Sequence, residues 1–141
     1  MKKLVMAATL STSLLALAAQ AAEPLAFQGV MKELGKHMQT VAGAIALEDW
    51  ETVEKTAPLI AAHPQPPAEE KARIIGFMGA NMGKFKSFDM QAHEAAHKME
   101  HAAHEQDGQQ VIDAYREVQS ACLGCHQNFR KPFVEHFYGK K

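Results

Sequence analysis

The chain has 141 residues, of which 47% are hydrophobic and 22% charged, and its 15 Lys and Arg against 16 Asp and Glu give a formal net charge of −1. This near balance excludes the strongly basic surface that is typical of nucleic-acid-binding domains. A chain of this length is sufficient for one domain with a single hydrophobic core.

The first 21 residues have the pattern of a secretory signal peptide. Two lysines follow Met1, an apolar stretch runs over residues 4–18, and Ala19-Gln20-Ala21 provides an Ala-x-Ala cleavage site. The apolar run is shorter than the ~20 residues that span a bilayer, which disfavours a membrane anchor. We therefore expect export to the periplasm, cleavage near Ala21, and a mature domain over residues 22–141 with no stable membrane insertion. Cleavage would leave 120 of the 141 residues, with 13 basic against 16 acidic ones and a formal charge of −3.

Helical periodicity dominates the rest of the chain, and no stretch shows the strict alternation of strands. A first helix is predicted from about Pro24 to Ala46, where apolar residues recur at helical spacing. A second helix is predicted from a cap at Asp49 to about Ala62, where His63-Pro64-Gln65-Pro66-Pro67 stops it.

The stretch from Ala68 to Phe85 is predicted to be a loose or partly helical connection, because three glycines weaken any helix there. These are Gly76, Gly79 and Gly83. A third helix is predicted from about Ser87 to Gln106, and Asp107-Gly108 separates it from a fourth.

Four histidines lie on the third predicted helix at spacings of four, four and three residues, namely His93, His97, His101 and His104. Imidazoles at i and i+4 can bind a divalent transition metal. The apolar stripe of this helix falls largely on the opposite face, so we expect the histidines to face solvent. Since no carboxylate or cysteine completes an obvious ligand set, a histidine-rich metal-binding protein is the less favoured interpretation.

The fourth predicted helix contains Cys122-Leu123-Gly124-Cys125-His126, with the chain's only two cysteines. Cys-x-x-Cys-His is the attachment signature of a c-type haem, in which two thiols add to the haem vinyl groups and the imidazole ligates iron. A dithiol redox site would need a βαβ context and a structural zinc site a second ligand pair, and the sequence has neither.

The spacing of the motif places all three side chains on one turn of helix, facing the core. We therefore predict one covalent haem c on Cys122 and Cys125, with His126 as the proximal iron ligand. Export agrees with this cofactor, because bacteria attach c-type haem outside the cytoplasm.

Pro132 is predicted to stop or kink the fourth helix, because it lacks a backbone donor and disfavours helical geometry at Lys131. Residues 133–141 are then a tail or a short separate turn. The apolar residues of this tail are expected to pack, for example on the haem edge. They are Phe133, Val134, Phe137 and Tyr138.

A haem-attachment motif near the C-terminus of an all-helical chain of this length resembles the cytochrome c′ superfamily, the class II c-type cytochromes. The resemblance extends over the whole mature chain and depends most on residues 122–130 and, in the first helix, on residues 30–38. It implies an all-α fold, an antiparallel up-down four-helix bundle with haem near the C-terminus of the last helix. It also implies a haem-environment role for Arg130, four residues after His126, and this side chain is equally placed to interact with the helix dipole. The chain departs from the family in having Phe27 where many members have an arginine and in its longer tail.

In such a bundle the start of the first helix lies beside the end of the fourth, so the distal ligand of the iron should come from early in the first helix. Met31 lies ~10 Å from the helix start, whereas Met38 lies another ~10 Å along the axis and is too deep. The resemblance agrees, since low-spin members of the cytochrome c-556 type use a methionine at the position of Met31. The alternatives are that Met31 is only a flexible core residue or, more distantly, that His37 is the ligand.

Ligation by His126 and Met31 would give a low-spin haem with a raised potential, suited to electron transfer. We therefore predict a periplasmic electron carrier that is not an enzyme and whose partners are redox proteins. An open distal position would instead give a five-coordinate cytochrome c′ that binds small gases such as nitric oxide.

The sequence also bears on the partners. Lys131, Lys140 and Lys141 make the C-terminus basic and are candidates for orienting an acidic redox partner. A homodimer through the first two helices, with Trp50 as a surface aromatic, and a monomer are both compatible with the chain.

Overall fold

The structure, a computed structural model, describes residues 25–139. All regular secondary structure in this range is helical, as expected from the sequence. None of the helices in this range is long and apolar enough to cross a membrane. The predicted signal peptide and the two C-terminal lysines, Lys140 and Lys141, lie outside the described residues.

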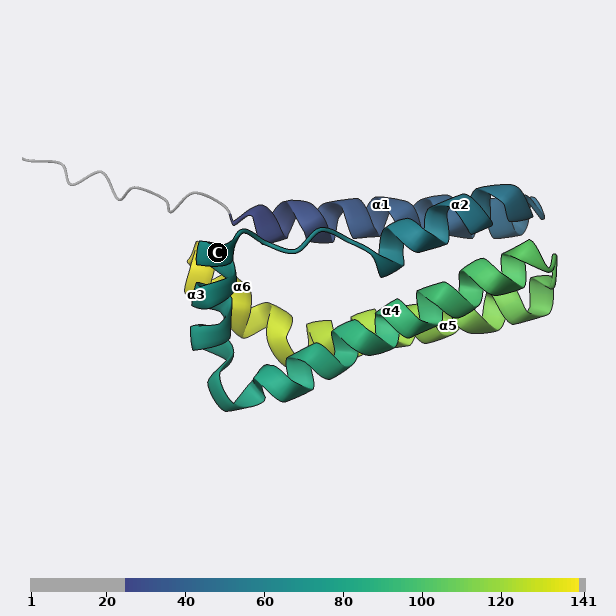
Figure 1. Ribbon diagram of the computed structural model, residues 1–141. Helices are drawn as coiled ribbons and strands as arrows, with labels where there is room; N and C mark the ends of the chain where they lie inside the picture. Colours follow the sequence, from purple (N-terminus) through teal and green to yellow (C-terminus); the bar gives the residue numbers. More distant parts are fainter. Residues whose placement is uncertain (1–24, 140–141) are drawn as a thin grey trace, which may run out of the picture.

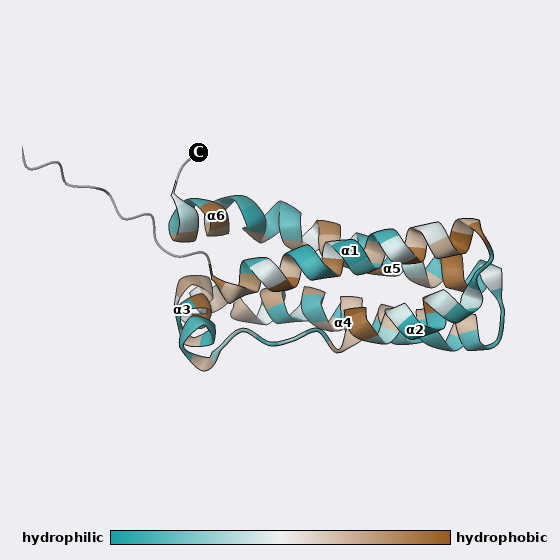
Figure 2. Ribbon diagram, turned by 90° about the horizontal axis from the view of Figure 1, so that it is seen from above, coloured by the Kyte–Doolittle hydropathy of each residue, from teal (hydrophilic) through white to brown (hydrophobic). Residues whose placement is uncertain are grey.

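Four helices form a bundle: α1 (Ala26–Ala46), α2 (Trp50–Ala61), α4 (Met82–His104) and α5 (Gly108–Cys125). Figures 1 and 2 show the bundle in views related by a quarter turn, in which α1 lies next to α2 and α5, and α4 likewise lies next to α2 and α5. The bounds of α1 and α2 confirm the first two predicted helices.

Aspartate caps begin two of these helices. The Asp49 carboxylate accepts a hydrogen bond from the Thr52 amide at the start of α2, and Asp107 accepts one from Gln110 at the start of α5. Such caps satisfy backbone donors that the first helical turn leaves free. Because each capped helix begins within four residues of the end of the preceding one, short turns connect α1 to α2 and α4 to α5.

Trp50, a candidate surface aromatic, is only partly exposed. Its ring packs against Gly108 so closely that a Cβ on this glycine would lie 2.9 Å from the indole. Trp50 is half-buried against the core of its own bundle, and the rest of its ring is accessible to solvent.

The core consists of two clusters. The larger lies between the four bundle helices and includes the fully buried Val41, Val53, Met99, Val111 and Val118. The smaller closes one end of the bundle and consists of Leu25, Ile74, Met78, Phe129, Phe133 and Phe137. Only the larger one corresponds to the apolar stripes of the predicted bundle.

The stretch over residues 68–85, expected to be a loose or partly helical connection, is helical over nearly its whole length. This stretch forms α3 (Ala68–Met78), a 3₁₀ turn η1 (Gly79–Asn81) and the first turn of α4, which begins at Met82 rather than near Ser87. Burial of Ile74 and Met78 in the smaller cluster outweighs the poor helix propensity of the glycines. Gly79 ends α3, where its φ of 48° is in the left-handed region that glycine tolerates.

The C-terminal prediction of a stop or kink at Pro132 is correct only in part, because the regular α-helix ends at Cys125 but the segment after Pro132 is helical rather than a tail or a short turn. After Cys125 the chain forms a π-helical turn (η2, His126–Arg130) and continues as α6 (Lys131–Tyr138). Pro132 lies in the first turn of α6, where its missing N–H has no helical partner to lose. Phe133 and Phe137 are buried, which confirms that the tail packs.

Candidate cofactor site

The Cys-x-x-Cys-His motif lies where the two core clusters meet. Cys122 packs against the larger cluster and Cys125 against the smaller one, and both are half-buried in the last turns of α5. His126 is the first residue of the π-helical turn and is exposed, so the prediction that all three motif side chains face the core applies only to the two cysteines. Such turns often mark functional sites because they change the direction in which a helix presents its side chains. No pattern in the sequence predicts this turn.

A cavity of about 640 Å³ lies between the start of α1 and the segment that follows α5. This volume is in the range of ~300–1,000 Å³ that is usual for small-molecule and cofactor sites. Five of its twelve lining residues are Phe or Tyr, and Gln28, Lys32, His126 and Arg130 contribute polar or charged groups. The lining includes Phe27, Met31, Phe85, His126, Phe129 and Arg130.

Two smaller cavities adjoin it. One, of about 70 Å³, is lined by Met31, His126, Cys122 and Cys125, so the structure brings all four predicted haem-binding residues to one place. The other, of about 230 Å³, opens between the start of α4 and the connection after α2 and is also lined by Met31. Met31 therefore lines all three cavities.

Met38 occupies a deeper position. It lines only the smallest cavity, and its carbonyl accepts a hydrogen bond of 3.4 Å from Tyr115, seven residues before Cys122 on α5. Its side chain packs on the larger core cluster. The predicted difference in depth between Met31 and Met38 agrees with these contacts.

Gly124 allows α4 to approach the motif. A Cβ at this position would lie 2.5 Å from the Phe88 ring, which is too close for any side chain to remain where it is. The side chain of Asn128 donates a hydrogen bond of 2.7 Å to the Gly124 carbonyl and accepts one of 2.6 Å from Lys84 on α4. These contacts hold the end of α5 and the π-helical turn against α4.

The two thiols are electrostatically unsuited to be thiolates. Burial raises the pKa of Cys122 and raises that of Cys125 to about 11, and the charge of Asp89 acts in the same direction on both. A structural zinc site needs thiolates, and no group of three or more His, Cys, Asp or Glu within residues 25–139 is placed to hold a metal ion.

The environment of His126 favours its neutral form. Burial lowers the pKa of the imidazole, and the positive charge of Arg130 lowers it further. Neutral imidazole is the form that ligates a metal. Two thiols, an imidazole, a thioether and aromatic walls around one space fit a covalently attached haem.

His63 and Asp89 form a polar pair at the edge of the site that sequence reasoning missed. Nε2 of His63 lies 3.3 Å from the Asp89 carboxylate, and Nδ1 lies 3.1 Å from the Ile60 carbonyl. The hydrogen bond between them raises the pKa of His63 and lowers that of Asp89, while burial opposes both shifts. Both residues line the two smaller cavities together with Met31. The pair was not detectable from the sequence, because it depends on how the segment after α2 packs on α4.

The remaining predicted residues lie outside the cavities or at their mouth. Arg130 is exposed at the mouth of the largest cavity. The four histidines of α4 are exposed, as predicted, and three of them bond to other groups. His93 contacts the Ala61 carbonyl at 2.7 Å, His97 contacts Glu100 at 3.1 Å and His104 contacts Glu54 at 3.0 Å. His37 is half-buried further along α1.

No protein-family model matches the chain, and no curated protein matches it either. The function of the site is therefore inferred from its residues and their geometry.

Proposed function

We propose that the protein is a monohaem c-type cytochrome that transfers electrons. One haem c is attached through Cys122 and Cys125, and its iron is ligated by His126 and, on the distal side, by Met31. The proposal is carried by one observation: Met31 on α1 and His126 line the same two cavities, next to both thiols. A histidine and a methionine together favour a six-coordinate, low-spin iron with a raised potential.

The proposal includes the architecture of the cytochrome c′ superfamily. The helices α1, α2, α4 and α5 form its antiparallel up-down bundle, and the haem lies near the C-terminal end of α5. Cavities lined by early residues of α1 and by the residues that follow α5 support this arrangement. The protein acts in the periplasm after removal of its signal peptide, and it turns over no substrate.

The haem supplies the change of oxidation state, and the protein chain controls it. The thioether bonds of the two cysteines hold the macrocycle at the junction of the core clusters. Phe27, Phe85 and Phe129 exclude water from it, and a site of low polarity favours the less charged ferrous state. Arg130, and Lys32 across the same cavity, are the cations available to the haem propionates.

The intact mass of the secreted protein tests the attachment. The full chain is produced in a bacterial host that carries a c-type haem attachment system. The expected mass is that of the chain cleaved near Ala21 plus one haem that denaturation does not release. The variant with Cys122→Ser and Cys125→Ser should lose the bound haem and keep its helical circular dichroism. A wild-type protein of the bare chain mass, from a host that loads a known c-type cytochrome, would contradict the proposal.

A further inference from the structure

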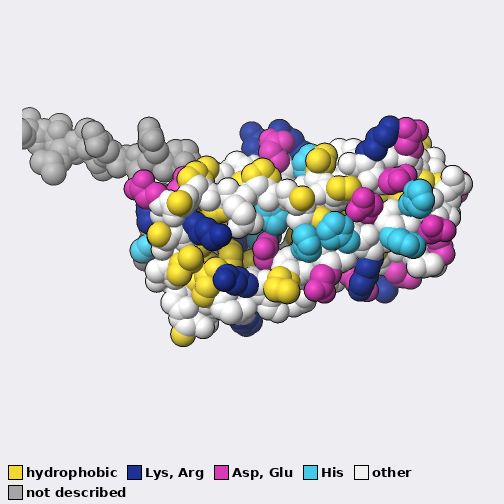
Figure 3. Space-filling view, viewed as in Figure 1, with side chains coloured by type: hydrophobic (Ala, Val, Ile, Leu, Met, Phe, Trp, Pro, Cys, Tyr) yellow, Lys and Arg dark blue, Asp and Glu magenta, His cyan; other side chains and the backbone are white. Residues whose placement is uncertain are grey.

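Charge is unevenly distributed along the bundle. Segments 48–58 and 94–117, at the end away from the three cavities that Met31 lines, carry ten acidic and three basic residues. Segments 26–38, 63–93 and 126–138, at the cavity end, carry five acidic and eight basic residues. Figure 3 shows one face of the molecule, on which acidic and histidine side chains gather over the half that contains the turns between α1 and α2 and between α4 and α5. Hydrophobic side chains and Lys or Arg gather around α3 and the start of α4.

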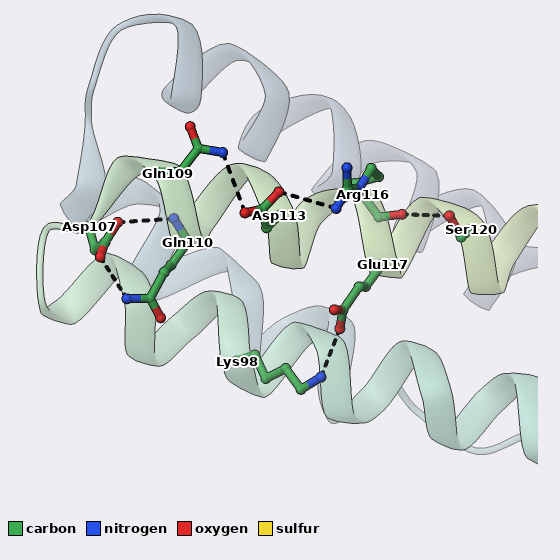
Figure 4. Close-up of polar contacts among 8 residues, drawn as sticks. All are labelled: Lys98, Asp107, Gln109, Gln110, Asp113, Arg116, Glu117 and Ser120. Atoms are coloured by element: carbon green, nitrogen blue, oxygen red, sulfur yellow. Dashed lines mark hydrogen bonds and ion pairs between the residues drawn. The ribbon is translucent and has the colours of Figure 1, made fainter.

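Each of the three basic residues at the acidic end forms an ion pair with a neighbouring carboxylate. Lys98 lies 2.8 Å from Glu117, as Figure 4 shows, and Arg116 lies 3.2 Å from Asp113. The third, Lys55, pairs with Glu51. This end therefore presents a net negative surface with its few cations already partnered.

The cavity end contains an apolar surface bordered by lysines. The cavity of about 230 Å³ is lined by Ile75 and Met90, whose exposed fractions are 43% and 59%, and by Lys71 and Lys86. No ion pair within residues 25–139 involves either lysine. Exposed apolar groups with a polar border commonly mark interaction sites. We refer to these four residues as the lysine-bordered surface.

The lysine-bordered surface adjoins the proposed haem. Its cavity is also lined by Phe27 and Met31, which line the largest cavity as well. A protein bound at this surface would thus lie beside the distal ligand of the iron.

We propose that the lysine-bordered surface is the docking site of an acidic redox protein, which the charge asymmetry of the bundle orients. The inference rests on the proposed electron-transfer function. Carboxylates of the partner would pair with Lys71 and Lys86 while Ile75 and Met90 provide the dry centre of the contact. The acidic far end repels the same partner, so encounters at the cavity end are favoured. One electron then passes between the haem iron and the partner's redox centre, one being oxidised as the other is reduced, with no bond made or broken.

Oxidation of the ferrous holoprotein by hexacyanoferrate(III) tests the local charge. Two charge-reversal variants are compared by stopped flow over a range of ionic strength: Lys71→Glu with Lys86→Glu, and Lys55→Glu with Lys98→Glu. Both change the net charge equally, but only the first pair borders the cavity. We expect the first variant to react ~3–10-fold more slowly than the wild type at low salt. The wild-type rate should fall as salt screens the attraction between the lysines and the anionic oxidant, and the rate of the first variant should not. The second should change the rate less than about twofold. Equal slowing in both variants would mean that net charge alone governs the rate, and would overturn the inference.

A second measurement does not depend on electron transfer. Amide chemical shifts of the ¹⁵N-labelled protein are recorded with a short poly-glutamate peptide at low and high salt. The expected shifts surround Lys71, Ile75, Lys86 and Met90, and they disappear in high salt. Shifts centred on the C-terminal lysines, or none, would overturn the docking site. If the wild-type protein carries no haem, the proposed function fails by itself, and the peptide experiment still tests the surface.

Discussion

Met31 is the residue on which the proposed function depends most. If it ligates the iron, Met31→Ala opens the distal position and converts the ferric haem from low-spin to high-spin. Met38 lies deeper, so Met38→Ala should keep the low-spin state and only reduce stability, by up to ~2 kcal/mol for a partly buried methionine. Electron paramagnetic resonance of the two ferric variants distinguishes these outcomes. An unchanged spin state in Met31→Ala would place the ligand elsewhere.

Gly124 has a packing role that its neighbours in the motif do not share. Alanine at this position must displace the Phe88 ring, which we expect to destabilise the protein by ~1–3 kcal/mol. Gly35 on α1 has no neighbouring atom within 4 Å of the position of a Cβ. Gly35→Ala should therefore stabilise the protein by ~0.5–1 kcal/mol through the greater helix propensity of alanine. Urea unfolding followed by circular dichroism measures both, and a stabilising Gly124→Ala would contradict the described packing.

Sequence patterns predict some residues of the site and not others. Cys122, Cys125 and His126 could be identified because their chemistry is encoded in local spacing, and Met31 because helix geometry sets its depth. His63 and Asp89 could not, since they are 26 residues apart and meet only because the segment after α2 folds back on α4. Periodicity describes a single helix and contains no information on such a contact.

The contact between His63 and Asp89 joins the segment after α2 to α4. The contribution of this contact to the free energy of unfolding should depend on pH. The pKa of His63 is raised, so the contribution is complete below the unfolded value of about 6.5 and is lost as the pH rises through the folded value. The pKa of Asp89 is lowered, so the contribution is also lost when the pH falls from about 4 through the folded value. The stabilisation is therefore greatest between about pH 4 and pH 6.5.

Urea unfolding of the wild type and of Asp89→Asn checks this window. Because the Asp89 side chain is 48% exposed, the variant should lose no more than ~1 kcal/mol at about pH 5.5, and the difference should shrink by about pH 8. Glu54→Gln, which removes the more exposed contact to His104, is the matched control and should have a smaller effect. A difference between wild type and Asp89→Asn that is constant over this range would contradict the pairing.

The two elements that the sequence predicted only in part both close the cavity end of the bundle. Glycine content argued against α3, and Pro132 argued against a helix beyond Arg130. Each forms because its apolar residues find partners in the other: Phe77 of α3 lies edge-on to Phe133 and Phe137 of α6, with ring centroids 5.9 and 5.4 Å apart. A tertiary contact of this kind outweighs local propensity and is not encoded within either segment.

At the scale of the whole molecule, the all-helical class follows directly from the periodicity of the apolar residues. The second core cluster and the segregation of charge do not, because both arise from bringing together segments far apart in the chain. The cavities lie at the junction of the two clusters, at the less acidic end of the bundle. This position agrees with the proposed haem site and with the proposed docking of a redox partner.

The optical spectrum of the wild-type holoprotein, in the ferric state and in the ferrous state with and without carbon monoxide, tests the central claim most directly. Ligation by both His126 and Met31 predicts a low-spin, six-coordinate spectrum in each oxidation state and poor binding of carbon monoxide. A high-spin, five-coordinate spectrum with ready binding of carbon monoxide would contradict it and would indicate a gas-binding cytochrome c′ instead.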